Sequence, residues 1–354
     1  MNKILYVGGF ILPDKNAAAS RVINNAKALN KNGNEVIFIN YDENCNFKVE
    51  KEYYGFKCYE FPKMSLYDTV CKVDDILIII KNENITHIIM YNYPLIGMWK
   101  LMKYCRSRGI KCIGDISEWY VGNHGFFYNI LKNIESNLRM IFLNKKLDSI
   151  IAISQFLYDY YKKDINTIKV PPLVDISDSK WGSIEKDNSI LTFCFVGSVN
   201  KQKERLDYIV ESIAHIDFDL NFQFKIVGIS KDDFEKHYNY IVNDSRIIFL
   251  GKVNNAEAIK ILKSSDWTLL IKDVNLVTTA GFPTKVAESI SAGVPIIANE
   301  FSNIFEYLND TNSIKVNSID DLSDIIVSAC KTFKKFDTSI FDYNNYLDDF
   351  KKIL

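Results

Sequence analysis

One stretch in the second half of the chain combines groups that can bind a phosphorylated ligand. Gly281 and Pro283 make a tight entry, and Thr284 can cap the helix that follows. Lys285 falls in the first turn, where backbone N–H groups and the helix dipole favour an anion. Glu288, one turn after Thr284, can accept two hydrogen bonds from a vicinal diol such as a ribose. The stretch suggests a nucleotide diphosphate site; an ordinary capped helix with a solvated glutamate is the alternative.

The strands expected before this helix end in residues suited to ligand binding. Four predicted strands end directly before a glycine or a lysine: 190–196 before Gly197, 222–227 before Gly228, 247–250 before Gly251 and 267–271 before Lys272. Open α/β sheets bind their ligands at the carboxyl ends of their strands. We therefore expect a doubly wound domain whose ligand-binding edge carries these residues.

The first half of the chain shows the same alternation of elements. Residues 3–7 are predicted to form a strand, 17–29 a helix and 34–40 a second strand. Gly8 and Gly9 fill the turn after the first strand. They either let a phosphate approach the backbone closely or make only a tight turn. The pattern indicates a second doubly wound α/β domain.

Three polar side chains of the first half are candidates for ligand contact. Arg21 lies early in the first helix, where it reaches either into a cleft at the strand ends or into a surface ion pair. Glu118 follows the predicted strand 110–116, at the edge where ligands bind. His124 lies between glycines in a turn, which favours an exposed side chain and a substrate contact.

Residues 126–146 are predicted to form one long amphipathic helix. Its cations are Lys132, Arg139, Lys145 and Lys146. A helix of this kind can lie on an anionic membrane, and packing on its own sheet is the other interpretation. Peripheral membrane contact is therefore left open.

The length of the chain and the position of its structure-breaking residues predict two domains. A chain of 354 residues exceeds the usual size of a single core. Paired prolines and a polar run interrupt the pattern before it restarts near residue 190. We expect an N-terminal domain at 1–175, a linker at 176–188, a C-terminal domain at 189–335 and a tail at 336–354 that packs back toward the N-terminal domain.

Composition excludes several classes of protein. The net charge of -1, from 43 basic and 44 acidic residues, gives no electrostatic reason to expect a nucleic-acid partner. The seven cysteines include no CxxC pair, which indicates reduced thiols in a cytosol and neither a disulfide framework nor a zinc site. The N-terminus has the pattern of a strand and not of a signal peptide. No apolar run reaches the roughly 18 residues of a membrane span.

Several of these residues together resemble a known signature. Gly281-Phe-Pro with Glu288 and Ser291-Ala-Gly-Val-Pro295, preceded by Gly197 and Lys203, resembles the donor site of retaining glycosyltransferases of the GT-B fold, in particular family 4. The resemblance spans nearly the whole chain. It implies two doubly wound, Rossmann-like domains that face each other across a cleft, with the donor bound by the C-terminal domain and the acceptor on the N-terminal side.

The resemblance implies roles for individual residues of the C-terminal domain. Lys203 matches the lysine that holds the donor diphosphate. Phe282, Pro283 and Thr284 match the loop whose backbone meets the donor. Glu288 matches the glutamate that binds the ribose.

In the N-terminal domain the resemblance covers fewer residues. Gly8 and Gly9 resemble the loop that faces the phosphates, and His124 resembles the histidine near the transferred sugar. No nucleophile is evident from the sequence. Glu118 and His124 are the candidates for contact with the reacting sugar.

The chain departs from the family pattern at two positions. The family has a second glutamate before the ribose glutamate (E-x7-E), and Ala280 stands there in this sequence. An arginine usually follows the strand-end glycine, and Ser198 stands there instead. Lys272 or Arg205 is the expected replacement for the missing cation.

The implied activity is transfer of a sugar, with retention, from a nucleotide diphosphate sugar to a saccharide or lipid-linked saccharide. Lys203, Lys285 and the helix start at Thr284 would stabilise the leaving diphosphate without a metal or other cofactor. Bacterial surface polysaccharide or glycan synthesis, in the cytoplasm or at the inner face of the cell membrane, is the setting that the resemblance implies. The alternatives are a degenerate subunit that binds a nucleotide sugar or a partner glycosyltransferase, and a nucleotide-sugar epimerase.

Overall fold

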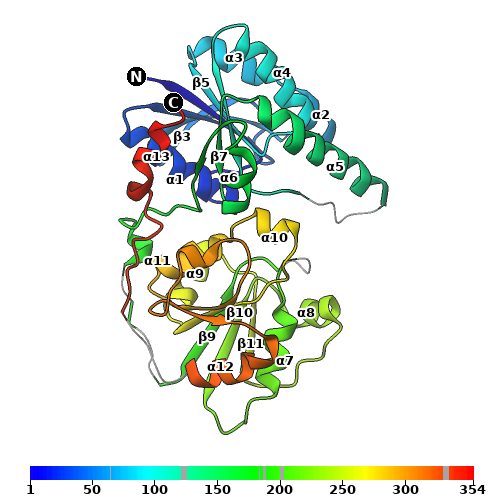
Figure 1. The fold of residues 1–354 in the computed structure, drawn as a ribbon, viewed down its shortest axis with the longest axis vertical. Helices are drawn as coiled ribbons and strands as arrows, with labels where there is room; N and C mark the ends of the chain where they lie inside the picture. Colours follow the sequence, from blue (N-terminus) through cyan, green and yellow to red (C-terminus); the bar gives the residue numbers. More distant parts are fainter. Residues whose placement is uncertain (64, 121–125, 183, 186–188, 200–202, 330–334) are drawn as a thin grey trace. The chain divides into compact units, whose positions relative to one another are not determined.

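The computed structural model divides into two compact units (Figure 1). It describes residues 1–63, 65–120, 126–182, 184–185, 189–199, 203–329 and 335–354. The first unit contains Met1–Val174, Ala280–Phe282 and Asp342–Leu354. The second unit contains Asp175–Thr279 and Pro283–Phe341. Each unit has its own sheet, so the prediction of two doubly wound α/β domains is confirmed. That a cleft lies between them stays a prediction.

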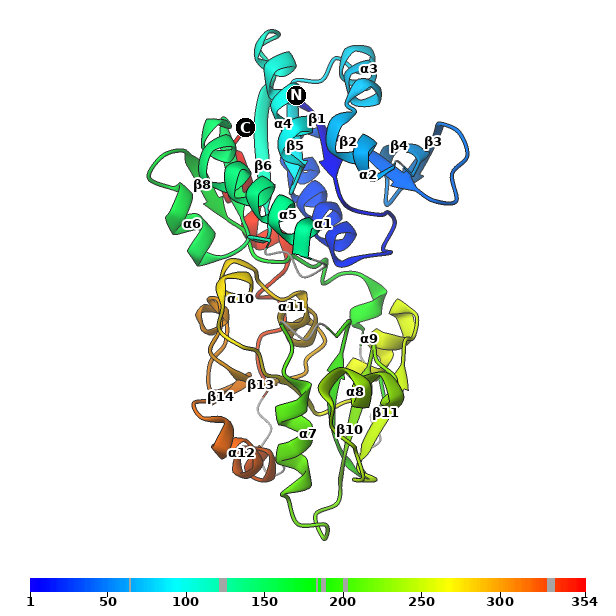
Figure 2. The ribbon, with the colours of Figure 1, turned by 90° about the vertical axis from the view of Figure 1, so that its right-hand side faces the viewer.

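The first unit is built on an eight-stranded sheet of order β3-β4-β2-β1-β5-β6-β7-β8. Its strands are β1 (Lys3–Gly8), β2 (Glu35–Asp42), β3 (Val49–Tyr53), β4 (Phe56–Pro62), β5 (His87–Tyr91), β6 (Lys111–Ile116), β7 (Ser149–Ala152) and β8 (Asn166–Lys169). All neighbours pair in parallel except β3, which runs antiparallel to β4. Figure 2 shows this hairpin at one edge of the sheet.

Helices cover both faces of the first sheet. They are α1 (Ala17–Lys31), α2 (Leu66–Cys71), α3 (Asp74–Asn82), α4 (Leu95–Arg106), α5 (Phe126–Leu138), α6 (Gln155–Tyr161) and α13 (Leu347–Lys351). Because crossovers between parallel strands are right-handed, α1 covers one face, and α4 and α5 cover the other. Figure 1 shows α13 beside α1, on the side of the sheet away from α4 and α5.

The central strand and the first helix form for reasons that are visible in the sequence. Residues 4–7 of β1 are all buried, as expected for a parallel strand covered on both faces. Asn16 caps α1 by accepting a hydrogen bond from the N–H of Ala19 at 2.9 Å. Val22 and Ile23 then face the core from α1. The predicted strand and helix are confirmed, with the helix two residues longer than expected.

The long helix predicted at 126–146 is helical throughout but is not one α-helix. The α-helix α5 ends at Leu138, a π-helical turn follows at Arg139–Leu143, and a 3₁₀ turn closes the segment at Asn144–Lys146. The prediction of a single α-helix is therefore wrong beyond Leu138. Single π turns inside helices often mark sites under functional constraint.

The second unit has a six-stranded, fully parallel sheet of order β11-β10-β9-β12-β13-β14. Its strands are β9 (Leu191–Val196), β10 (Phe222–Val227), β11 (Ile247–Gly251), β12 (Trp267–Leu270), β13 (Ile296–Asn299) and β14 (Ser313–Val316). The helices of this half of the chain are α7 (Leu206–Ala214), α8 (Lys231–Tyr238), α9 (Asn255–Lys263), α10 (Leu276–Ala280), α11 (Thr284–Ser291) and α12 (Leu322–Ala329). Helix α12 packs against α7 (Figure 1).

The last residues of the chain pack on the first unit. Asp342 forms a parallel bridge with Val174, where the chain leaves that unit. The backbone N–H of Tyr343 donates to the carbonyl of Val174 at 2.9 Å. Phe350 is fully buried in the core that α1 and β1 share. The chain thus returns to the first unit at Asp342 and completes its core.

The described residues of the segment expected to be a linker group with the second unit. The boundary falls between Val174 and Asp175. Lys263 at the end of α9 donates to the carbonyl of Lys180 at 2.9 Å. Residues 178–182 are therefore held against the second unit.

Within the described residues, no helix is long and apolar enough to cross a membrane.

Candidate functional site

The second sheet reverses its strand order between β9 and β12. The chain starts in β9, moves outward through β10 and β11, and returns to β12 on the other side of β9. Such a reversal separates the loops that follow the two strands, which is where open α/β sheets bind ligands. Gly197 follows β9 directly, and Lys272 comes two residues after the end of β12. The sequence placed both residues at the ligand edge.

Two strand-end glycines let the loops at this edge come very close. Gly197 and Gly228 have φ angles of +140° and +111°, which other residues rarely adopt. A Cβ atom on Gly228 would lie 2.1 Å from the carbonyl oxygen of Gly197. A Cβ atom on Gly197 would lie 2.4 Å from Cε of Lys285. The two glycines therefore bring the loop after β9 against Lys285 of α11.

A buried carboxylate holds two lysines at this edge. Glu204 is only 4 % exposed, and its Oε1 accepts from Nζ of Lys272 at 2.8 Å. The same oxygen accepts from Nζ of Lys285 at 3.2 Å. Lys272 is predominantly buried, and Lys285 is half-buried. Two ammonium groups and one carboxylate leave this cluster with a net positive charge.

Burial and mutual charge shift the acid–base equilibria of the cluster. Burial alone would raise the pKa of Glu204, but Lys285 and Lys272 outweigh it and keep that pKa below its usual value. Burial lowers the pKa of Lys272 to about 8, although Glu204 acts in the opposite direction. The nearby charges of Lys285 and Lys203 contribute to this lowering of the pKa. The net charge of the cluster therefore depends on pH within the range accessible to experiment.

Lys285 links this cluster to the start of α11. Its Nζ lies 3.5 Å from the carbonyl oxygen of Ser198 and 5.0 Å from the ring centre of Phe195. The prediction that Thr284 caps the helix is wrong, because Pro283 occupies the cap position and makes no side-chain hydrogen bond. The first turn of α11 therefore has no side-chain cap, which leaves it suited to an anion.

Glu288 lies one turn into α11 with an unusual environment. Its side chain is half-buried, and among the described residues it has no hydrogen-bond or ion-pair partner. Burial raises the pKa of its carboxyl group, and the charges of Lys285 and Lys180 offset part of that rise. A carboxylate left without a partner at a sheet edge is suited to hydrogen bonding with a ligand.

Arg205 is paired with two carboxylates outside this cluster. Its guanidinium pairs with Asp207 at 2.8 Å and with Asp273 at 3.0 Å, and it stacks on the ring of Tyr208. The interpretation of Arg205 as the replacement cation is therefore not supported by its contacts. Lys272 lies in the cluster and remains the candidate for the replacement cation.

The first unit repeats the strand-order reversal between β1 and β5. A Cβ atom on Gly8 would lie 2.4 Å from the carbonyl oxygen of Tyr91, at the end of β5. Position 8 therefore needs a glycine, because the neighbouring strand β5 leaves no room for a Cβ atom. Gly9 is exposed, and nothing lies within 4 Å of the position that its Cβ would take. Of the two glycines, only Gly9 has open space beside it.

Arg21 is buried, and its hydrogen-bond partners lie inside the first unit. It is 2 % exposed, and Asp115, which it contacts at 2.7 Å, is 0 % exposed. Its guanidinium also donates to the carbonyls of Val170 and Pro171, at 3.0 and 3.2 Å. Both sequence-based alternatives, an open cleft and a surface ion pair, are wrong. Arg21 instead ties α1 to the end of β6 and to the chain after β8.

The other candidate residues are divided among the parts of the structure. Glu118 follows β6 in the first unit and is half-buried. His124 lies outside the described residues. Gly281 and the buried Phe282 group with the first unit, whereas Pro283 and the helix α11 that follows it group with the second unit. The structure thus brings together one set of residues from the second unit: Gly197, Ser198, Gly228, Lys272, Lys285 and Glu204, with Lys203 near Lys272.

Of this set, Glu204 was not predicted. Nothing in the local sequence distinguishes a buried glutamate from a solvated one.

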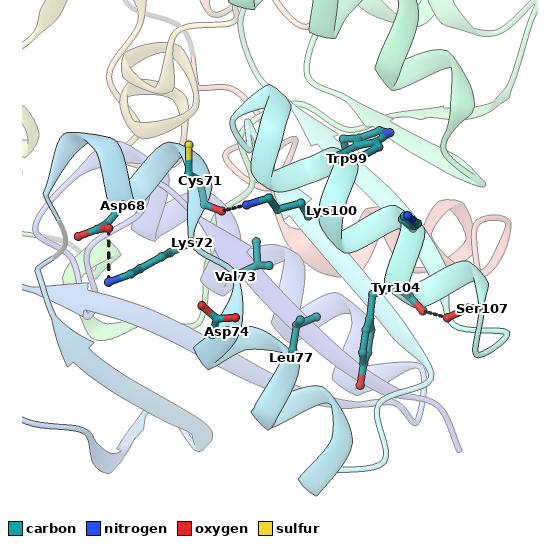
Figure 3. A pocket seen from close by; sticks show the side chains of 11 residues that line it. Asp68, Cys71, Lys72, Val73, Asp74, Leu77, Trp99, Lys100, Tyr104 and Ser107 are labelled. Atoms are coloured by element: carbon teal, nitrogen blue, oxygen red, sulfur yellow. Dashed lines mark hydrogen bonds and ion pairs between the residues drawn. The ribbon is translucent and has the colours of Figure 1, made fainter.

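A cavity of about 670 Å³ lies elsewhere in the first unit, among α2, α3 and α4 (Figure 3). Figure 3 shows Trp99 and Tyr104 from α4 and Leu77 from α3 among the side chains that line it. Lys100 donates to the carbonyl of Cys71 at 2.8 Å, and Lys72 pairs with Asp68 at 3.4 Å. None of the predicted site residues lines this cavity.

Comparisons with known proteins find one family that matches part of the chain and several structures with the same fold. Residues 191–332 match the family described as "Glycosyl transferases group 1". No curated protein sequence matches the chain. Among solved structures, the chain resembles a sucrose-phosphate synthase from Thermosynechococcus elongatus, with a TM-score of 0.74 and 13% identity over 100% of this chain and 98% of that one.

Two further structures resemble the chain over nearly its full length. One is a glycosyltransferase from Rickettsia africae, with a TM-score of 0.68 and 14% identity over 99% of this chain and 97% of that one. The other is HepE of Anabaena in complex with UDP-glucose, with a TM-score of 0.63 and 11% identity over 99% of this chain and 100% of that one. The match over residues 191–332 covers most of the second unit, and the chain as a whole has the GT-B fold of these structures.

Proposed function

We propose that the chain is a retaining, metal-independent glycosyltransferase that uses a nucleotide diphosphate sugar as donor. One observation carries the proposal: Lys272 and Lys285 converge on buried Glu204 at the switch point of the second sheet, with unpaired Glu288 one turn further along α11. A net positive cluster at a helix start suits a diphosphate. A carboxylate nearby suits a ribose diol.

The proposed donor site assigns a task to each part of the cluster. The diphosphate would contact Lys285, the first turn of α11 and the loop at Gly197 and Ser198, with Lys203 and Lys272 adding charge. The ribose would bind Glu288. A sugar-bound uridine diphosphate is the first donor to test, because UDP-glucose is bound by HepE, which has the same fold.

Catalysis at this site would depend on charge stabilisation. When the bond from the sugar to the diphosphate breaks, negative charge develops on the departing phosphate oxygens. Lysines held in place by Glu204 are preorganised to stabilise that charge, and they supply the cations that a metal would otherwise supply. Glu118 and His124 are proposed to contact the transferred sugar from the first unit, with Gly9 beside the phosphates.

The acceptor proposed is a saccharide or a lipid-linked saccharide, in bacterial surface polysaccharide or glycan synthesis. We propose a cytoplasmic protein with peripheral contact to the membrane.

A thermal-shift screen against UDP-, GDP-, dTDP-, ADP- and CMP-sugars tests the donor, because a ligand that binds the folded state raises the unfolding midpoint. Release of the nucleotide only in the presence of an acceptor, followed by NMR assignment of the anomeric linkage, tests transfer and retention. Binding without turnover would favour the degenerate subunit.

Replacing Glu288 by alanine is expected to weaken donor binding by about 1–3 kcal/mol, because the ribose hydroxyls lose a buried acceptor. Isothermal titration with the donor found in the screen measures this effect. Glu211, an exposed glutamate of α7, gives the matched control Glu211→Ala, which should bind the donor normally. Unchanged affinity in Glu288→Ala would refute the assignment of Glu288 to the ribose.

Donor affinity is expected to fall as the pH rises through 8. The pKa of Lys272 is lowered to about 8 in the free protein, so its charge is present below that pH and lost above it. A bound diphosphate favours the charged form, so binding above pH 8 requires proton uptake, and affinity at pH 9 should be about tenfold lower than at pH 7. Lys272→Arg stays charged and should lose this dependence. Identical pH profiles for both proteins would remove Lys272 from the donor site.

A further inference from the structure

Direct contacts between α2 and α4 fix the shape of the cavity among α2, α3 and α4. Gly97 lets α4 approach α2, because a Cβ atom there would lie 2.7 Å from Cε1 of Tyr93 and 3.3 Å from the carbonyl oxygen of Val70. Lys100 of α4 donates to the carbonyl of Cys71, the last residue of α2, at 2.8 Å. Figure 3 shows this side chain reaching from one helix to the other. The cavity is therefore part of the packing of the first unit.

Helix α4 places two aromatic side chains at this cavity. Trp99 is 55% exposed, and Tyr104 is half-buried. The guanidinium of Arg108 lies 3.8 Å from the centre of the Tyr104 ring and covers one face of it. The ammonium group of Lys103 lies 5.8 Å from the centre of the Trp99 ring. A large aromatic side chain left exposed beside a cavity provides a stacking surface for a ligand.

Charged groups of both signs surround this aromatic surface. Lys72 and Asp68 pair at 3.4 Å on the α2 side. Asp74, in the first turn of α3, and Lys103 of α4 are exposed, and both line the cavity. Its walls therefore offer carboxylate oxygens that accept hydrogen bonds and ammonium groups that donate them. Three lysines and two aspartates line the cavity, so the charges nearly cancel.

This combination of groups distinguishes between classes of ligand. A phosphorylated ligand is bound by an excess of cations, and Asp68 and Asp74 oppose such an excess. The core of a protein interface is depleted of charged residues, whereas charged residues are found among the lining residues here. A pyranose ring has C–H groups that pack on an aromatic ring and hydroxyls that both donate and accept hydrogen bonds. The volume of about 670 Å³ also lies within the roughly 300–1,000 Å³ of small-molecule sites.

We propose that the cavity among α2, α3 and α4 binds a saccharide. A pyranose ring would stack on Trp99, and its hydroxyls would bond to the carboxylate of Asp74 and the ammonium group of Lys103. Leu77 of α3 would pack against the C–H groups of the sugar. The proposal concerns the first unit alone and does not depend on the donor site.

Fluorine NMR of the full chain labelled with fluorotryptophan tests this site. The chain has four tryptophans, and the variant Trp99→Phe identifies the resonance of Trp99. Maltotriose, cellotriose and chitotriose are the probes, and the quantity measured is the chemical shift of that resonance during titration. We expect at least one probe to shift it along a saturating curve. No shift of this resonance with any of the three probes would overturn the proposal.

Substitutions then test the individual contacts, with saturation-transfer NMR of the saccharide as the measure of affinity. Trp99→Ala should bind about tenfold more weakly, the usual effect of losing one stacked aromatic ring. Asp74→Ala should bind about three- to tenfold more weakly, because the sugar hydroxyls lose an acceptor. The matched controls are Phe47→Ala, which removes an aromatic side chain that is 71% exposed elsewhere in the first unit, and Glu52→Ala, which removes an exposed carboxylate of β3. Both controls should bind normally.

Two further outcomes would count against the site. Equal binding by Trp99→Ala and Phe47→Ala, at unchanged unfolding midpoints, would show that the saccharide binds elsewhere and would overturn the proposal. A larger shift of the Trp99 resonance with uridine monophosphate than with any of the saccharides would overturn it in favour of a nucleotide.

Discussion

Replacing Arg21 by methionine is expected to lower the free energy of unfolding of the first unit by about 3–5 kcal/mol. The change leaves the carboxylate of Asp115 fully buried without its cation. Tyr6 and Asn25 still donate to that carboxylate, but neither supplies a charge. The carbonyls of Val170 and Pro171 also lose their donor. Urea unfolding followed by circular dichroism measures the loss.

A double variant separates the unpaired charge from the loss of packing. In Arg21→Met/Asp115→Asn no buried charge remains, so much of the lost stability should return. The two units need not unfold together, and the transition of the second unit should not move. A loss below about 1 kcal/mol in Arg21→Met would mean that the ion pair contributes no more than a typical surface pair.

Replacing Lys285 by alanine is expected to lower kcat about 100- to 1,000-fold, the usual effect of removing one preorganised group that stabilises charge in the transition state. Lys285 is the residue that joins Glu204, the loop at Ser198 and the first turn of α11. Lys272 keeps Glu204 paired in the variant, so the fold should be preserved. Steady-state kinetics with the donor and acceptor identified above measure the effect.

Lys252 offers the matched control for this substitution. It is an exposed lysine after β11 in the same unit, and Lys252→Ala should keep normal kcat. Lys285→Arg keeps the charge in an altered geometry and should be intermediate. A Lys285→Ala enzyme with normal kcat and a raised KM would show that Lys285 binds the ground state and the transition state equally, and not the leaving group in particular.

The sequence predicted the parts of the fold that have a strong local signal. Buried parallel strands are continuous apolar runs, so β1, β9 and β10 were found to within one or two residues. Helix α1 has both an apolar face and a cap, and it was found as well. The hairpin of β3 and β4 was missed, because β3 is mostly exposed and carries charged residues.

The candidate site was predictable only in part. Glycines at strand ends and the helix at Thr284 can be recognised in the sequence, because each depends on local conformation. The role of Glu204 depends on Lys272 and Lys285, which are 68 and 81 residues away in the chain. Arg21 was misjudged for the same reason, since its partner Asp115 is 94 residues away. Charge pairing across such distances has no local pattern.

The return of the chain to its first unit has a consequence for synthesis on the ribosome. Residues 175–279 and 283–341, which build the second unit, are made before residues 342–354, which complete the first. Until Phe350 emerges, the core that α1 and β1 share lacks one of its fully buried side chains. The domain that is translated first is therefore the last to be finished. A nascent chain that stalls near residue 341 would expose this incomplete core to chaperones and proteases.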